Sequence, residues 1–316
     1  MNFIKKTGFL ILIIVFVANL SATKYAGEIF RMGAGVRNFA LGNIGVSDLN
    51  SFGLAYWNSA YLYETTENKF ELMHAEEYAG LLKYDTASAI WGKNSKFSLV
   101  ITRIGIDDIP LTKLNDPNSV ISGSNRPYKY KSVNNSDLVI YFGMARKFGK
   151  YVLGFTPKIA YRNLAEESGF GFGADVSTYF KFKNFNFGLK LRDFFSTQIL
   201  WANGTHEIVT PGLDLEANYG FTLPVILRKS RLFLGLENHL EGRDTAAAMA
   251  VGPASFDYHL GWEINMHRAV ALYLGYDIEH FTSGLSLNIK SWLINYAFEQ
   301  NSDLESSHRI SIGYKM

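Results

Sequence analysis

The sequence predicts an all-β fold: a transmembrane antiparallel β-barrel of about 14 strands with an N-terminal plug in its lumen. Three observations predict it. Beyond about residue 68, hydrophobic residues recur with a period of two in segments of roughly 10 to 13 residues, the length that a tilted membrane strand needs. Short and long connections alternate between these segments. The chain also opens with the charge and hydropathy pattern of a secretory signal peptide.

Residues 1–22 are the predicted signal peptide. Lys5 and Lys6 precede the apolar run TGFLILIIVFVANLSA, which ends in small residues. A transmembrane anchor is the alternative, but the run is short for the roughly 20 residues of a spanning helix. Removing Lys5 and Lys6 from the 31 basic residues leaves 29, which match the 29 acidic residues. The mature charge therefore gives no reason to expect a nucleic acid partner.

Fourteen segments have the alternating pattern of a strand. In RLFLGLENH, for example, Leu232, Leu234 and Leu236 share one face. The final segment, HRISIGYKM, places Ile310 and Ile312 on one face and charged or small residues on the other. We expect it to pair with the first strand, so that the sheet has no edge. The segments begin near residues 68, 79, 95, 135, 150, 171, 185, 211, 230, 255, 268, 281, 291 and 306.

The connections between these segments are of two kinds. Those at KNS, FGK and KN are short, and LAEESGF is expected to be a moderate link. The long connections span 106–134, 196–210 and 242–254. A meander with its long loops at one end is typical of an outer-membrane barrel.

A soluble β-sandwich or a lipocalin-like barrel is the alternative, because alternation alone does not show which face is outside. The second face of most segments carries charged residues beside Gly and Ser, as a hydrated lumen would. Aromatic residues such as Trp91, Tyr151, Tyr161 and Phe281 recur near the segment ends, as they do at membrane interfaces. We therefore expect a barrel in the outer membrane of a Gram-negative-type bacterium, with its apolar face against lipid.

Residues 23–67 depart from the strand pattern. The stretch YAGEIFRMGAGVRNFALGNIGVSDLNSFGLAYWNSAYL is rich in Gly and small apolar residues, with a helical signal only around 36–41. It precedes the first strand on the side of the short turns. We expect it inside the lumen as a plug, and we assign residues 68–316 to the barrel.

The same stretch resembles the opening segment of the FadL superfamily, and more closely that of its PorV/PorQ branch. The resemblance is carried by GAGVR at 33–37, LGN at 41–43 and NSA at 58–60. Near the C-terminus, YLGYDIEHFTSGLSLNIKSWLINYAF and HRISIGYKM also look like that branch. Two positions depart from it: Ser59 stands where the branch usually has proline, and Met316 where it has a terminal aromatic residue.

The resemblance implies a fourteen-stranded outer-membrane barrel with an N-terminal hatch, whose last strand is read by the barrel-assembly machinery. FadL relatives pass hydrophobic small molecules across the outer membrane, so the resemblance favours transport of such a ligand. PorV-type relatives instead handle or anchor secreted proteins at the cell surface in type IX secretion. Both functions stay open at this point.

Two sets of candidate site residues follow. Transport would need a ligand site between plug and wall. The charged residues on the inward faces of the strands would line a pore or would hold the plug through ion pairs, with Arg37 as one partner. The predicted ligand-binding residues are Ala34, Val36, Arg37, Phe39, Ile44 and Asn58. The predicted polar lumen residues are Lys158, Arg162, Lys190, Arg192, Glu237 and Glu263.

The sequence predicts no catalytic site, metal or cofactor. The chain has no Cys, and its seven His are dispersed without the His-x-His or His-Glu-x-x-His spacing of a metal site. Asp257 and His259 share the expected lumen face, and a less favoured alternative, an outer-membrane hydrolase, would depend on them. GFGFGAD, 169–175, lacks the strand-to-helix context of a phosphate-binding loop, so we expect strand glycines there.

Overall fold

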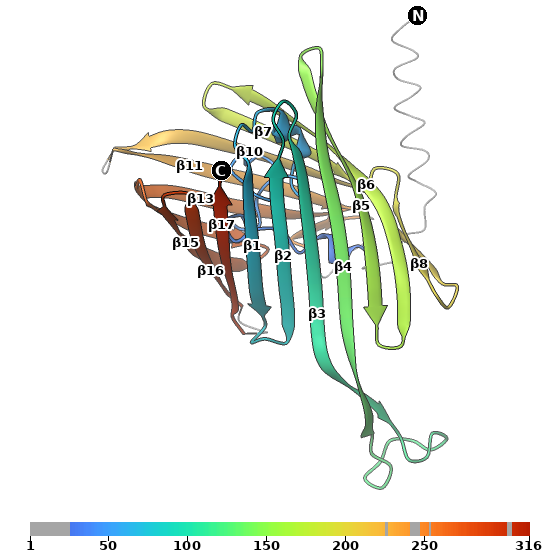
Figure 1. The fold of residues 1–316 in the computed structure, drawn as a ribbon. Helices are drawn as coiled ribbons and strands as arrows, with labels where there is room; N and C mark the ends of the chain where they lie inside the picture. Colours follow the sequence, from blue (N-terminus) through green and yellow to red (C-terminus); the bar gives the residue numbers. More distant parts are fainter. Residues whose placement is uncertain (1–25, 225–226, 241–246, 253, 302–304) are drawn as a thin grey trace, which may run out of the picture.

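The computed structural model describes residues 26–224, 227–240, 247–252, 254–301 and 305–316, so the predicted signal peptide lies outside the described residues. The described chain forms 17 strands, and those of the barrel close into one antiparallel ring (Figure 1). The barrel strands are β1 (Lys69–Glu77), β2 (Leu82–Trp91), β3 (Phe97–Lys113), β4 (Tyr128–Phe148), β5 (Tyr151–Leu164), β6 (Glu167–Phe182), β7 (Phe185–Arg192), β10 (Gly212–Leu223), β11 (Arg228–His239), β13 (Ala254–His267), β14 (Val270–Asp277), β15 (His280–Ile289), β16 (Trp292–Gln300) and β17 (Ser307–Lys315).

The first and last strands close the barrel. β1 and β17 run antiparallel, with Lys69 opposite Lys315 and Glu76 opposite His308. The other barrel strands pair with their neighbours in the chain, except that β7 pairs with β10 and β11 with β13. A closed ladder leaves no backbone edge facing lipid, where each unpaired polar group would cost several kcal/mol. The predicted antiparallel barrel of 14 strands is confirmed.

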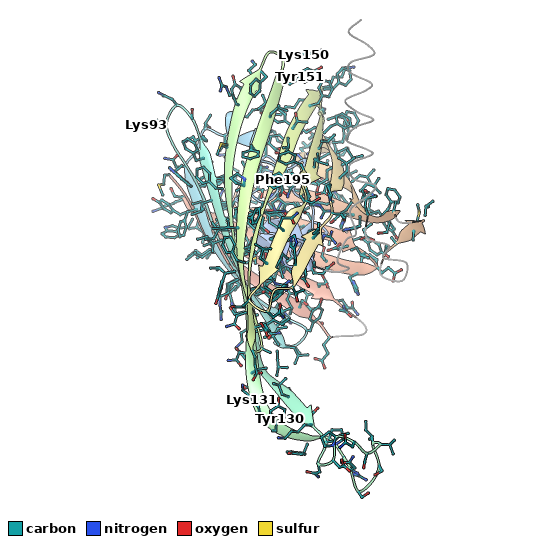
Figure 2. All side chains as sticks on the ribbon, turned by 90° about the vertical axis from the view of Figure 1, so that its right-hand side faces the viewer. Lys93, Tyr130, Lys131, Lys150, Tyr151 and Phe195 are labelled. Carbon is teal, nitrogen blue, oxygen red and sulfur yellow. The ribbon has the colours of Figure 1, made fainter. Side chains whose placement is uncertain are left out.

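The two ends of the barrel differ. Its turn end is defined by the short links 92–96, 149–150, 183–184, 268–269 and 290–291. At the opposite end, the loop end, β3 and β4 continue past the other strands as a projecting hairpin (Figure 1). Figure 2 shows Lys150 and Tyr151 at the turn end, and Tyr130 and Lys131 on that hairpin.

The long connection predicted at 106–134 is wrong in extent. β3 and β4 remain paired up to Lys113 and Tyr128, so only residues 114–127 form the loop. The register shifts between Ile106 and Ile109, and this bulge accommodates Pro110, which lacks a backbone donor. Beyond the barrel the hairpin has no further strand beside it, so the missing donor costs little.

Other predicted connections are also more structured than expected. The link predicted at LAEESGF is the two-residue turn Ala165–Glu166, with Ala165 at a φ of 57°. The connection at 196–210 contains the hairpin of β8 (Thr197–Trp201) and β9 (His206–Val209), and that at 242–254 contains β12 (Met249–Val251).

β6 changes its partner along its length. Toward the turn end it pairs with β7, from Val176 to Phe182, and toward the loop end it pairs with β8, where Gly169 lies opposite Trp201. Between the two, the backbone N–H of Phe194 donates to the carbonyl of Ala174 at 3.0 Å. The glycine-rich stretch 169–175 lies in this part of β6, as a strand, and its glycines leave room for the β8 side chains.

The barrel wall has an apolar outer face and a mixed inner face. Leu232, Leu234 and Leu236 point outward, and their side chains are 47%, 56% and 41% exposed. On the last strand Ile310 faces outward, while Arg309 is buried on the inner side. This alternation follows from the period of two along a strand. None of the helices among the described residues has the length and hydrophobicity to cross a bilayer.

Residues 26–68, called here the N-terminal segment, lie against the inner face of the wall. The segment contains η1 (Glu28–Phe30), α2 (Val36–Ala40) and η2 (Ser59–Tyr63). α2 contacts β14 to β17, and η2 contacts β3 to β6, so the segment reaches opposite sides of the barrel. Gly42 has a φ of 79°, and a Cβ there would lie 2.5 Å from the carbonyl oxygen of Leu260. A glycine is therefore required where the segment approaches β13.

Candidate functional site

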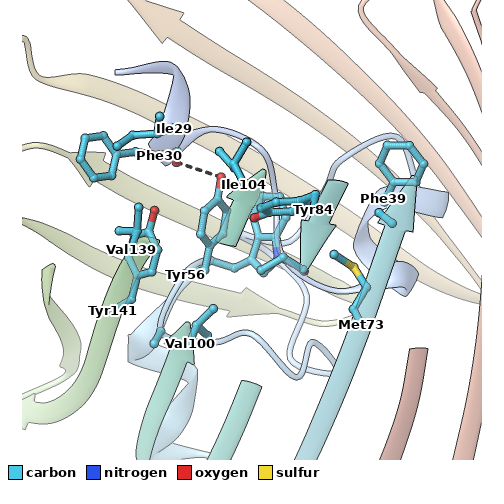
Figure 3. Close-up of a cluster of buried hydrophobic side chains, with 14 of the residues drawn as sticks. Ile29, Phe30, Phe39, Tyr56, Met73, Tyr84, Val100, Ile104, Val139 and Tyr141 are labelled. Atoms are coloured by element: carbon cyan, nitrogen blue, oxygen red, sulfur yellow. Dashed lines mark hydrogen bonds between the residues drawn. The ribbon is translucent and has the colours of Figure 1, made fainter. Parts of the chain in front are cut away.

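The inside of the barrel has two chemically different halves. The part formed by β2 to β4 is uncharged where it meets the N-terminal segment (Figure 3). Inward-facing positions from Tyr84 to Ile90, from Ser98 to Ile104 and from Val139 to Gly143 carry no charge. Apolar and aromatic wall residues pack there against Ile29, Phe30, Phe39 and Tyr56 of the segment; they are Met73, Tyr84, Val100, Ile104, Val139 and Tyr141.

Few directional bonds join the segment to the uncharged inner faces of β2 and β3. The Tyr84 hydroxyl donates to the Gly33 carbonyl at 2.5 Å, and the Ala55 N–H donates to the Ser98 hydroxyl at 3.1 Å. Tyr56 bonds within the segment, accepting from Gly33 N–H and donating to the Phe30 carbonyl, each at 3.0 Å. Dispersion and apolar burial therefore dominate this contact.

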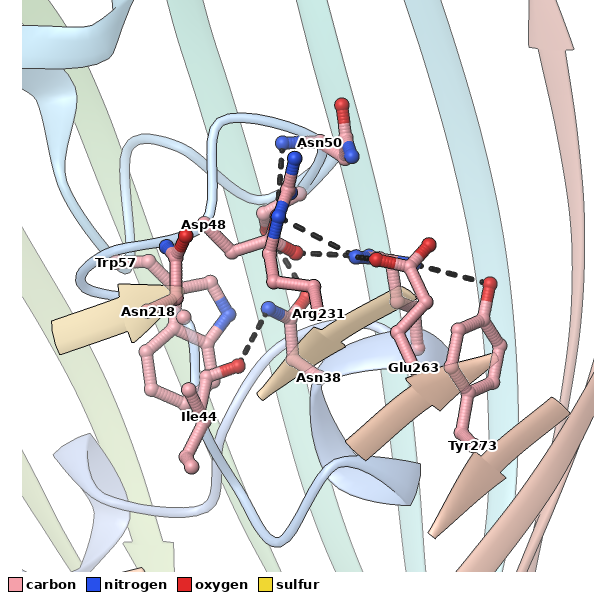
Figure 4. A network of polar contacts seen from close by, with 12 residues as sticks. Asn38, Ile44, Asp48, Asn50, Trp57, Asn218, Arg231, Glu263 and Tyr273 are labelled. Atoms are coloured by element: carbon pink, nitrogen blue, oxygen red, sulfur yellow. Dashed lines mark hydrogen bonds and ion pairs between the residues drawn. The ribbon is translucent and has the colours of Figure 1, made fainter. Parts of the chain in front are cut away.

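The second half of the lumen, formed by β5 to β14, holds the segment through buried charges. Arg37 of α2 lies between two carboxylates, with its Nε 2.7 Å from Asp48 and its two terminal nitrogens 2.9 and 3.0 Å from Glu263 of β13 (Figure 4). Arg37 also donates to the Tyr273 hydroxyl at 3.0 Å. Burial alone would raise the pKa of Asp48, but Arg37 and then Arg231 hold that pKa below its ordinary value.

A second group of buried charges centres on Lys158 and Lys190. Lys158 Nζ lies 2.8 Å from Asp175 and 2.7 Å from Asp193, and Lys190 lies 3.2 Å from Asp175. Lys190 also donates to the Tyr56 carbonyl at 2.5 Å. Lys158 lies over the Phe30 ring at 4.8 Å. Both lysines therefore contact the N-terminal segment and wall carboxylates at once.

A third group surrounds Arg192 and His259. Arg192 pairs with Glu237 and, at 3.1 Å, with Asp214. The Nδ1 atom of His259 lies 2.9 Å from Asp277 and 3.1 Å from the Gly42 carbonyl of the segment. This group therefore also joins the wall to the segment.

Backbone N–H groups of the segment also donate hydrogen bonds to the charged half of the lumen. Glu216 of β10 accepts hydrogen bonds from Gly45 N–H at 3.1 Å and from Ser47 N–H at 2.7 Å. The two bonds to one carboxylate are charge-assisted, so they are stronger than bonds between neutral groups.

The predicted polar lumen residues all lie on the inner side of the wall, but they fall into different groups. Lys158 and Lys190 share Asp175, Arg192 and Glu237 pair with each other, and Glu263 joins Arg37. Arg162 pairs instead with Asp137 of β4 at 2.9 Å and lies over the Trp201 ring at 5.3 Å. Its partners thus belong to the wall and to the β8 hairpin.

The predicted ligand-binding residues are buried within the segment's contacts. Ala34, Val36, Phe39 and Ile44 are each at most 4% exposed. The list is completed by Asn58, which caps η2 by accepting from Ala60 N–H at 3.1 Å and donates to the Val46 carbonyl at 2.8 Å. Arg37 borders a hollow of about 200 Å³ at the turn end, next to Asn50, Glu263 and Lys315. The role of the six predicted residues in binding a ligand stays a prediction.

Several partners of these residues were missed in the sequence. Asp175 and Asp214 stand at inward positions of β6 and β10, so the same alternation that marked Lys158 and Arg192 was a sufficient signal. Asp48 had no such signal, because the segment that carries it has no regular period.

Asp257 and His259 have different partners in the structure. Asp257 lies 3.2 Å from His239, while the ring nitrogens of His259 face Asp277 and, at 3.6 Å, Glu237. The ring of His259 thus lies between two wall carboxylates, whereas Asp257 lies beside a different histidine. Among the described residues, no three His, Asp or Glu side chains are grouped as metal ligands would be.

Comparisons with known proteins identify the type of barrel. No protein-family model and no curated protein matches the sequence. The toluene transporters TbuX of Ralstonia pickettii and TodX of Pseudomonas putida both give a TM-score of 0.56 at 10% identity, over 90% of this chain and 98% of theirs. The fold is that of these transporter barrels. The monoaromatic hydrocarbon channel CymD gives a TM-score of 0.53 at 9% identity, over 90% of this chain and 97% of its own. At these identities the likeness concerns the fold.

Proposed function

We propose that this chain is an outer-membrane conduit for hydrophobic small molecules, with the N-terminal segment as the plug that closes its lumen. The observation that carries the proposal is the uncharged part of the lumen, between the segment and β2 to β4. The solved barrels of similar fold are transporters or channels for toluene and other monoaromatic hydrocarbons, which supports a small apolar solute.

The division of the lumen indicates where such a solute would pass. Moving the segment away from β5 to β14 would break the buried Arg37–Glu263 pair, at a cost of about 3 to 5 kcal/mol. It would also remove the bonds from Lys190 to the Tyr56 carbonyl and from Gly45 and Ser47 to Glu216. Moving it away from β2 and β3 breaks mainly apolar contacts, which a hydrophobic solute replaces. The passage therefore opens along β2 to β4, next to Ala34, while Arg37 and Asn58 hold the segment in place.

A pair of disulfide tethers tests this passage, because the chain has no Cys of its own. A Cβ at Gly53 would lie 3.6 Å from the Ser88 hydroxyl of β2, so Gly53→Cys with Ser88→Cys ties the segment to the apolar side. The hydroxyls of Ser59 and Thr156 of β5 are 2.5 Å apart, so Ser59→Cys with Thr156→Cys is the matched tether on the charged side.

We expect the oxidised Gly53–Ser88 tether to abolish uptake of a labelled monoaromatic hydrocarbon by cells that express the chain. Reduction should restore uptake, because only the disulfide differs between the two states. The oxidised Ser59–Thr156 tether should leave uptake nearly unchanged. Uptake that persists with both tethers oxidised would disprove displacement of the segment as the route.

A second candidate is the PorV-type role in protein secretion, which derives from the resemblance of GAGVR and the C-terminal stretch. One observation favours it: the projecting β3–β4 hairpin carries Val120 and Ile121 near its tip, 83% and 71% exposed. Exposed apolar residues on a projecting hairpin suit contact with another protein. Affinity purification from the native host, with and without residues 109–131, tests this. Recovery of the same proteins with both chains would count against it.

A further inference from the structure

The outer wall carries a large apolar groove that the lumen does not explain. It has a volume of about 920 Å³ and crosses the wall from β5 to β13, starting at the turn end. Its volume is in the range of binding pockets for small molecules. Its side walls are outward-facing apolar residues, among them Tyr151, Phe180, Phe187, Leu189, Leu215 and Leu236. Gly188 and Gly235 of the wall lie at its base.

Cations stand at the turn-end mouth of this groove. Lys150 borders it directly and lies over the Tyr151 ring at 5.1 Å (Figure 2). Lys183, in the next hairpin turn, lies over the Phe182 ring at 5.3 Å. In the described part of the chain neither lysine forms an ion pair. Both charges are therefore held at the aromatic rim without an acidic partner.

The turn end around the mouth of the groove is also positively charged. Its acidic residues are Glu64 and Glu67, and Glu64 already pairs with Lys181. Its exposed cations outnumber them; they are Lys93, Arg146, Lys147, Lys150, Lys183, Lys229, Arg268 and Lys290. An anionic ligand is thus attracted to this end, and the groove decides where it binds.

We propose that this groove binds an anionic glycerophospholipid, with one acyl chain in the groove and the head-group phosphate held by Lys150 and Lys183. Aromatic residues mark the level of the head groups in a bilayer, and Tyr151 and Phe182 place the two lysines at that level. The occupant is a lipid because the groove opens onto the apolar outer wall and its charged mouth lies at the interface. The inference requires the barrel to be embedded in a bilayer, and it does not depend on what passes through the lumen.

Lipid binding to the purified full chain tests the proposal by native mass spectrometry. Phosphatidylglycerol should bind about tenfold or more tightly than phosphatidylcholine of the same chains, because only the former carries a net negative charge. Lys150→Gln with Lys183→Gln should remove that preference. Lys290→Gln is the matched control, since Lys290 is an exposed turn-end cation outside the groove, and it should leave the preference intact.

A second variant tests the acyl chain. Leu215→Trp fills the middle of the groove and should weaken phosphatidylglycerol binding, while glycerol phosphate, which has the head group without the chains, should not bind. Heat-modifiable gel mobility shows that each variant is folded. Equal binding of the two lipids, an equal loss in Lys290→Gln, or unchanged binding in Leu215→Trp would overturn the proposal. Uptake of hydrocarbon is a separate readout, so failure of the lipid site leaves the transport proposal untouched.

Discussion

Arg37 of the N-terminal segment and Glu263 of β13 form a buried bidentate pair, with their two N–O distances at 2.9 and 3.0 Å. They stand 226 positions apart in the chain. A planar guanidinium facing both oxygens of one carboxylate fixes direction as well as distance. The pair therefore sets how α2 is oriented in the lumen.

Glu263→Ala should destabilise the protein by about 3 to 5 kcal/mol, because it leaves Arg37 with half of its counter-charge in a buried site. Unfolding in urea, followed by the loss of heat-modifiable mobility, measures this. Asp107→Ala is the control, since it removes an exposed ion pair with Lys83, which is screened by solvent and should change stability little. Equal losses in the two variants would show that the pair does not anchor the segment.

The pH dependence of the segment should follow Asp48. Its folded-state pKa lies below the ordinary value, so its ion pair with Arg37 contributes stability above about pH 4. That contribution is lost as the pH falls through the lowered folded-state pKa. We expect protease resistance of the segment to be constant from neutral pH to about pH 5 and to fall only in stronger acid. Asp48→Asn should show less resistance at neutral pH and a flatter acid response; an unchanged response would contradict the assignment.

A comparison of Gly42 with Gly80 distinguishes the cost of backbone strain from the cost of a steric clash with the wall. Gly42 and Gly80 have φ values of 79° and 83°, so alanine is strained by about 1 kcal/mol at either position. A Cβ at Gly42 would also lie 2.5 Å from the Leu260 carbonyl, whereas at Gly80 nothing lies within 4 Å. Gly42→Ala should therefore cost clearly more stability than Gly80→Ala and should expose the segment to protease. Similar unfolding midpoints for the two variants would show that the wall accommodates the methyl group.

The last three residues complete the closing strand. The N–H of Met316 donates to the Asn68 carbonyl and that of Lys315 to the Ser291 carbonyl, both at 2.9 Å, and the Tyr314 ring lies 4.7 Å from Trp292. Deleting residues 314–316 should block membrane insertion, because it opens the ladder on both sides of β17. Met316→Phe should insert normally, because it places an aromatic residue at the end of the strand, as in the PorV/PorQ branch that the sequence resembles. Normal insertion of the truncated chain would refute this role for the strand.

The alternation of side chains made the barrel predictable from the sequence. A period of two assigns each residue of a strand to one face, so Lys158, Arg192 and Glu237 could be placed inside without knowing their partners. Partner choice was not predictable, because it depends on the register between strands and on where the segment crosses them. Asp193, which pairs with Lys158, lies just after the end of β7, where the alternation stops.

The extent of the projecting hairpin was unpredictable for a different reason. Inside a membrane the thickness of the bilayer limits a strand to roughly ten residues, and the expected bounds of β3 and β4 used that limit. Past the bilayer only pairing between the two strands sets the length, and it continues here to Lys113 and Tyr128. Pro110 lies within this extended pairing, opposite Ser132 and next to the bulge that tolerates it.

Because β6 changes its partner, its backbone hydrogen-bond ladder is divided into two separate stretches. Its pairing with β7 runs over seven consecutive residue pairs, whereas its pairing with β8 runs over four, from Gly169 to Phe172. Short ladders open more readily than long ones, so amide protons of Gln198 to Trp201 should exchange with deuterium before those of β7, although both groups lie beside the same strand. Local opening would then start at β8, next to Phe194, without breaking the β6–β7 pairs that keep the ring closed.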